Sequence, residues 1–172
     1  MNIQEVFDTV ADVNWKETDR FLIGEFKVNN IEYKIQIQRR PIEGVKNGAE
    51  VSFYVKTSDN EQAFSTMNLH KLVPTKVYGI VFNALLTKVD QFDTLYFNAE
   101  KRHSKTDKEW EIKLHIYSTL AMRLKNAGFK EYQTRSHSTS TEWVLSKVSL
   151  NENSKFIYVQ QLAVERANEM FS

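Results

Sequence analysis

The side chains of this sequence that could hold a ligand gather in three polar connections, at residues 58–74, 100–108 and 134–141. Their basic and imidazole side chains include His70, Lys71, Lys101, Arg102, His103, Lys105, Arg135 and His137. If the three connections share one end of a sheet, where open α/β sheets bind ligands, they form a basic rim rich in hydroxyls. Such a rim suits an anion, such as a nucleotide phosphate or an acidic protein surface. Ordinary solvated loops have the same composition, so both interpretations stay open.

The familiar motifs of metal and covalent chemistry are missing from the sequence. It has no cysteine, and its four histidines lack the spacing of zinc ligands, so we predict no metal site. No G-x-S-x-G nucleophile turn and no phosphate-binding P-loop occur. The carboxylates Asp107, Glu109 and Glu111 lie in the first turn of a predicted helix, where the macrodipole favours negative charge. We therefore assign them a structural role.

Composition narrows the class of protein further. The chain has 172 residues, of which 41% are hydrophobic, so it is long enough for one domain with a substantial core. Its formal net charge of +1 disfavours a dedicated nucleic-acid binder. Neither a signal peptide nor an apolar run of roughly 18 residues is present, so we expect no membrane partner and a cytoplasmic location. The absence of cysteine agrees with a reducing compartment.

The clearest structural signal is a hairpin over residues 21–38, FLIGEFKV-NN-IEYKIQIQ. Apolar and polar residues alternate on its second arm, which is typical of a strand with one solvated face. Asn29 and Asn30 tolerate the positive φ that a two-residue turn needs. This turn places Leu22 opposite Ile37, and the apolar faces of the two arms then agree.

The rest of the sequence predicts further helices and strands. We predict helices over 2–10, 75–92, from the Thr106/Glu109 capping box to Gly128, and about 156–170, and strands over 50–57, 93–99, 129–135 and 142–148. Ser58 and Glu61 have capping-box spacing, which predicts one helical turn in the connection after residue 57. The result is a mixed, mostly antiparallel sheet with one parallel strand–helix–strand crossover and helices on both faces. We expect a single domain over 1–172, made of a helix and hairpin (1–49), a core (50–147) and a C-terminal helix (154–172).

This order of elements resembles the GNAT family of N-acetyltransferases. The segment IYSTLAMRLKNAGFKEY is similar to the part of that family where a helix with a tyrosine leads into "GF" and a strand. The resemblance implies an acyl-CoA-dependent transferase with Tyr117 as general acid and Asn98 as an orienting group. The family binds its cofactor with a loop of the form Gln/Arg-x-x-Gly-x-Gly/Ala, whereas residues 58–74 contain no glycine. We therefore expect no acetyl-CoA cofactor.

Residues 50–147 also resemble small uncharacterised proteins of tailed bacteriophages, through the segments VYGIVFNALLTKV, DTLYFNAE and TEWVLSK. That resemblance implies an accessory protein that binds a host or phage protein, or a small anionic ligand, on an acetyltransferase-like scaffold. Two alternatives remain, an active N-acetyltransferase and a structural component of the virus particle. The last alternative would use self-association through the apolar stripe of the final helix, which contains Phe156, Val159, Ala163, Ala167 and Met170.

Overall fold

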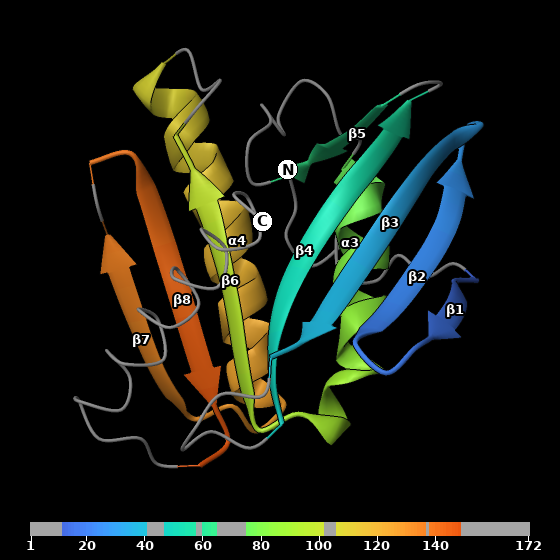
Figure 1. Cartoon of the computed structure of the whole chain (residues 1–172). Helices are drawn as coiled ribbons and strands as arrows, with labels where there is room; N and C mark the ends of the chain where they lie inside the picture. The colour runs from blue at the N-terminus through green and yellow to red at the C-terminus, as the bar shows by residue number, and fades with distance from the viewer. Residues whose placement is uncertain are drawn as a thin grey trace, which may run out of the picture.

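The computed structural model describes residues 12–40, 47–57, 60–64, 75–101, 106–136 and 138–148. They form a mixed sheet of eight strands, seven of them in the order β1-β2-β3-β4-β6-β8-β7, while β5 pairs with β4 (Figure 1). The elements are β1 (Asn14–Glu17), β2 (Phe21–Val28), β3 (Ile31–Arg39), β4 (Gly48–Thr57), β5 (Asn60–Ala63), α3 (Thr75–Leu86), the 3₁₀ helix η2 (Val89–Gln91), β6 (Thr94–Glu100), α4 (Asp107–Asn126), β7 (Glu131–Ser136) and β8 (Ser140–Ser146). The mixed, mostly antiparallel class predicted from the sequence is confirmed.

The hairpin of β2 and β3 has the predicted register. Leu22 lies opposite Ile37 and Val28 opposite Ile31. Asn29 and Asn30 adopt φ angles of 52° and 66°, the left-handed conformation that a tight hairpin turn requires. The local pattern therefore contained both the turn and the register of this hairpin.

The predicted parallel crossover runs from β4 through α3 to β6. The parallel ladder has three residue pairs, from Gly48 opposite Thr94 to Glu50 opposite Tyr96. The helix is shorter than the predicted range of 75–92, because α3 ends at Leu86 and η2 follows it. Lys88 N donates to Leu85 O (2.9 Å), and such i→i−3 bonds tighten the last turn of a helix.

The second helix, α4, begins and ends where the sequence predicts. The Thr106 hydroxyl accepts a hydrogen bond from Glu109 N (3.2 Å), as expected for an N-cap. Gly128, just beyond the helix, adopts φ 109°, a conformation that glycine accepts without steric cost. From there the chain turns into β7, which pairs antiparallel with β8.

Both described helices, α3 and α4, cover the same face of the sheet, so the predicted helices on both faces are not seen among the described residues (Figure 1). The ring of Phe53 on β4 contacts Phe82 of α3, and that of Phe97 on β6 contacts Tyr117 of α4. The core between this helix-covered face and the helices is apolar, and its fully buried members include Ile35, Ile37, Val81, Leu85, Leu95, Leu120, Leu124, Phe129 and Leu145. The predicted helices at 2–10 and 156–170 lie outside the described residues. No helix among the described residues is long and apolar enough to cross a membrane.

Two short strands were not predicted. β1 has four residues, too few for a visible alternation of apolar and polar side chains. β5 folds back on β4, so the helical turn predicted from Ser58 and Glu61 is wrong at residues 60–63. Glu61 instead accepts a hydrogen bond from Lys34 Nζ across the sheet (2.8 Å), a contact between residues distant in sequence.

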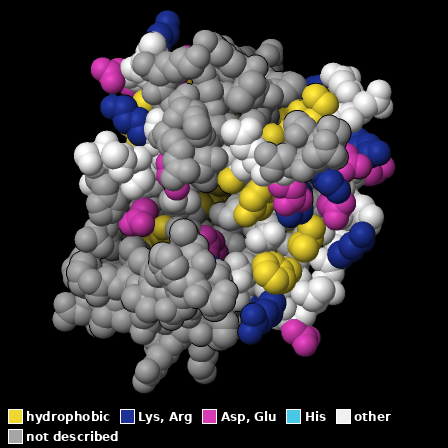
Figure 2. All heavy atoms as spheres, turned by 45° about the horizontal axis from the view of Figure 1, so that its top comes forward, with side chains coloured by type: hydrophobic (Ala, Val, Ile, Leu, Met, Phe, Trp, Pro, Cys, Tyr) yellow, Lys and Arg dark blue, Asp and Glu magenta, His cyan; other side chains and the backbone are white. Residues whose placement is uncertain are grey.

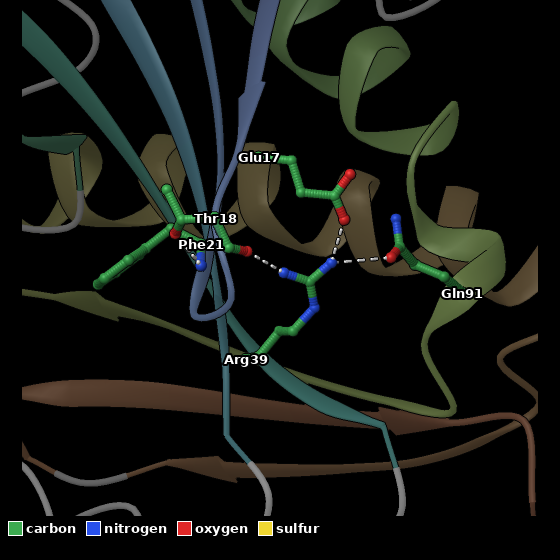
Figure 3. A network of polar contacts seen from close by, with 5 residues as sticks. All are labelled: Glu17, Thr18, Phe21, Arg39 and Gln91. Carbon is green, nitrogen blue, oxygen red and sulfur yellow. Dashed lines mark hydrogen bonds and ion pairs between the residues drawn. The ribbon is translucent and has the colours of Figure 1, made fainter.

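The Arg39 guanidinium joins three elements at one end of the sheet (Figure 3). It donates to Thr18 O (2.7 Å) and to the Glu17 carboxylate, both at the end of β1, and to Gln91 Oε1 of η2 (3.2 Å). The planar guanidinium has five donors, and this fork allows one side chain to hold several acceptors. Arg39 thereby fixes the edge strand β1 against the crossover.

The Tyr33 side chain gives the first prediction. Tyr33 is 1% exposed, and its hydroxyl has no hydrogen-bond partner among the described residues. Since a buried unpaired hydroxyl costs stability, Tyr33→Phe should raise the free energy of unfolding by about 1 kcal/mol. Tyr54→Phe is the matched control, because the Tyr54 side chain is only half-buried and should change stability little. Urea unfolding measures both, and a clear loss of stability in Tyr33→Phe would refute the assignment.

Candidate functional site

The three polar connections begin and end at one end of the sheet. Because β4 and β6 run parallel, the connections that follow Thr57 and Glu100 leave the sheet at the same end (Figure 1). Glu100 lies opposite Ser140, and Lys101 N donates to Thr139 O (2.8 Å), so the β7–β8 turn lies beside the end of β6. We call this region the loop end of the sheet.

The structure describes part of the predicted rim. Lys101 lies at the loop end, where its Nζ is 3.5 Å from Asp107 Oδ1 and its side chain is partly exposed. Arg135 belongs to β7, opposite Glu142 of β8, which in turn lies opposite Asn98 of β6. The other predicted rim residues, His70, Lys71, Arg102, His103, Lys105 and His137, lie outside the described residues.

Tyr117 is a core residue. It is 3% exposed, and its ring stacks on Trp143 (centroids 5.6 Å apart, planes at 13°) and on Phe97 (6.0 Å). Burial raises the pKa of Tyr117 above its ordinary value, and the nearby Tyr54 phenol raises it further. Burial likewise raises the pKa of Tyr78, with smaller contributions from Tyr117 and Tyr33. These phenols therefore keep their protons at neutral pH.

Asn98 lies on the other side of the sheet from Tyr117. Successive residues of a strand point to opposite faces, and Phe97 packs against α4, so half-buried Asn98 faces away from the helices. We call the side that faces away from α3 and α4 the open face. The structure therefore does not bring together the two residues to which the acetyltransferase resemblance assigns catalysis.

The open face holds a polar cluster that the sequence did not reveal. Arg40 donates from Nη2 and Nε to Glu50 Oε2 (3.1 and 3.3 Å), and both residues are buried. Beside them the Tyr96 hydroxyl donates to Glu142 Oε1 (3.0 Å). The alternation along β4, β6 and β8 places Glu50, Tyr96 and the half-buried Glu142 on the open face, but no local signal in the sequence indicated that the Glu50 carboxylate would be buried. Arg40 directly follows β3, and no pattern in the neighbouring sequence predicted that it would be buried.

A buried lysine lies under the loop end. Lys113 of α4 is 1% exposed, and its Nζ donates to Glu100 O at the end of β6 (2.8 Å). Burial lowers the pKa of Lys113 to about 8, against the opposing effect of the Glu100 charge. Lys113 precedes Tyr117 by one helical turn, so the 3.6-residue period could have placed it on the buried face. This hydrogen bond joins α4 to the end of β6, the strand from which the connection 100–108 starts.

A groove lies at the opposite edge of the sheet, between β1 and α3. Its cavity volume is about 400 Å³, and its lining residues are Asp12, Val13, Trp15, Ile80, Asn83, Ala84 and Thr87. This groove was not predicted from the sequence, because β1, which forms one of its sides, was not predicted.

Charged side chains of both signs are mixed on the described surface. In Figure 2, Lys and Arg side chains alternate with Asp and Glu along the right of the view, and they do not form a continuous basic patch there. Pairs such as Lys27 with Glu32 (3.4 Å) and Lys34 with Glu61 (2.8 Å) account for part of this mixing. Among the described residues, no group of three His, Cys, Asp or Glu side chains could hold a metal ion.

Comparison with known proteins gives no relative: no family model matches the chain, and no match was found among curated proteins or solved structures. Inference about function therefore starts from the arrangement of residues alone.

Lys113 gives a prediction about pH. Its pKa is lower in the folded chain than the usual 10.5, so above about pH 8 the folded state binds fewer protons than the unfolded state. The free energy of unfolding should therefore rise with pH between about 8 and about 9.5, below the titration of unfolded tyrosines. Lys113→Met should remove this rise, and Lys125→Met, at an exposed position of the same helix, should retain it. Urea unfolding at several pH values measures the slope, and equal slopes in all three proteins would contradict the prediction.

Proposed function

We propose that this chain is a phage-type accessory protein that acts by binding an anionic partner at the loop end of its sheet. The partner is an acidic surface of a host or phage protein, or a small anion such as a nucleotide, and binding takes place in the host cytoplasm. On this proposal the scaffold is acetyltransferase-like but degenerate, and the protein releases no product.

One observation supports the proposal most directly, the common exit of the three polar connections. The parallel direction of β4 and β6 and the pairing of Glu100 with Ser140 bring the starts of these connections to one end of the sheet. Their sequences contain most of the basic and imidazole side chains singled out above. The buried position of Tyr117 supports binding over turnover, because an acid must reach its substrate to donate a proton.

Acyl transfer is the second candidate, and one feature favours it. The ladder between β4 and β6 ends at Glu50 and Tyr96, although both strands continue toward the loop end. Beyond that point, Tyr54 of the open face raises the pKa of Tyr117 on the helix-covered face. The two phenols are therefore close enough to interact across the sheet where the strands part.

A thermal melt with two probes tests the anion proposal. ATP represents a nucleotide, and poly-L-glutamate represents an acidic protein surface. Either probe should raise the Tm of the chain, since a ligand at a hundred times its Kd adds about 2.7 kcal/mol of stability. Because the attraction is electrostatic, the rise should shrink as salt is added.

Charge reversal locates the binding. Lys101→Glu combined with Lys105→Glu should abolish most of the rise in Tm. The matched control combines Lys125→Glu with Lys130→Glu, two exposed lysines at the opposite end of the sheet, and should keep it. If neither probe raises the Tm of the wild-type chain, or if both variants respond equally, the proposal fails.

Acetyl-CoA separates the second candidate from the first. Acetyl-CoA contains a phosphorylated adenosine, so adenosine 3′,5′-bisphosphate is the matched control ligand. Under the anion proposal, the two ligands should raise the Tm by similar amounts, and the Lys101/Lys105 variant should lose both effects. A larger rise with acetyl-CoA that persists in this variant would favour an acyltransferase instead.

A further inference from the structure

Among the described residues, β1 is an edge strand of the sheet, and its outer side pairs with no other described strand. β1 lies at one end of the strand order and pairs with β2 through Asn14–Glu17. One row of its peptide N–H and C=O groups faces away from β2. Such a row is a template on which an extended segment of another chain can add a strand.

Helix α3 faces Trp15 across the groove. Ile80, Asn83, Ala84 and Thr87 have the spacing i, i+3, i+4, i+7, so they lie along one side of the helix, and this side lines the groove. Trp15, with Val13, lines the groove from the sheet. A strand added outside β1 would direct every second side chain to the helix-covered side of the sheet, where this groove lies. Its volume of about 400 Å³ lies within the range of known ligand pockets, about 300–1,000 Å³.

The Trp15 wall of the groove is held in place before any partner arrives. Trp15 lies opposite Gly24 of β2, and a Cβ at Gly24 would come within 3.1 Å of the Trp15 ring and 2.8 Å of Val13 Cγ1. Lys88 Nζ lies 5.2 Å from the centroid of the indole, a cation–π distance. A preformed wall lowers the entropic cost of binding.

Charge indicates what kind of strand fits. Lys16 points to the open face, is exposed, and forms no ion pair with any described residue. An edge lysine disfavours pairing with basic or purely apolar strands and favours an acidic residue directly opposite. The neighbouring Glu17 is already held by Arg39 (Figure 3), so it does not oppose an acidic partner as a free charge would.

We propose that the outer edge of β1 and the groove between β1 and α3 bind an extended segment of another protein, in which apolar side chains entering the groove alternate with acidic side chains opposite Lys16. This surface is separate from the loop end and does not depend on the function proposed there.

A synthetic peptide tests the proposal with the full chain. The probe is a capped octapeptide that alternates glutamate with valine or leucine, titrated by calorimetry. It should bind saturably, and the same peptide methylated on alternate backbone nitrogens should bind at least tenfold more weakly, because it cannot complete the ladder. Ala84→Phe, which fills the groove, should weaken binding by a similar factor, and circular dichroism checks that this variant folds.

Reversing the charge at Lys16 distinguishes a binding role from a structural role, because a purely structural residue would not change which peptide charge is preferred. Lys16→Glu should weaken binding of the glutamate peptide several-fold and strengthen binding of the matching lysine peptide, whereas Lys125→Glu should change neither. Absence of saturable binding, equal binding of the methylated peptide, or no response to the swap would overturn the proposal. So would a dimer of the chain that Lys16→Glu dissolves, because the occupant of the edge would then be a second copy.

Discussion

The arrangement of this fold depends on the short parallel ladder between β4 and β6. Three residue pairs, Gly48–Glu50 with Thr94–Tyr96, join the half-sheet of β1–β4 to the half-sheet of β6–β8. The join continues just beyond the strands, where Asp93 N donates to Asn47 O (3.0 Å) and Asn47 Nδ2 donates to Asp93 Oδ2 (3.4 Å). So short a ladder sets the relative direction of the two half-sheets but contributes little to stability. The apolar layer under α3 and α4 must therefore supply most of the stability of the join.

Polar groups on the open face lie beside this ladder. Glu50, held by Arg40, is the residue paired with Tyr96, whose hydroxyl donates to Glu142. A buried ion pair adds little net stability after desolvation, but leaving one member unpaired is costly. The Arg40–Glu50 pair therefore disfavours any slip in register that would separate its members. It also links the end of β3 to β4, the strand from which the first polar connection leaves at the loop end.

The elements that were predicted correctly are those that a few adjacent residues specify. The Asn29-Asn30 turn, the Thr106 cap and Gly128 were all read correctly, because each depends on a few adjacent residues. β1 and β5 were missed, since a four-residue strand is stabilised by its neighbours and not by its own pattern. The groove and the buried Arg40–Glu50 pair could not be foreseen for the same reason, as each joins segments whose proximity exists only after folding.

The sheet also separates the titratable groups and so limits which of them can act together. Tyr117 and Lys113 belong to α4 on one side, while Asn98 and Glu142 lie on the other, so the paired strands separate potential acids from potential ligand-orienting groups. Proton transfer between them would require passage through the sheet, in which the ladder of β4 and β6 ends at Glu50 and Tyr96. A partner that only binds needs no such passage. Binding at the loop end or at the edge of β1 therefore uses the fold as it stands, whereas catalysis would require the two half-sheets to accept a substrate between them.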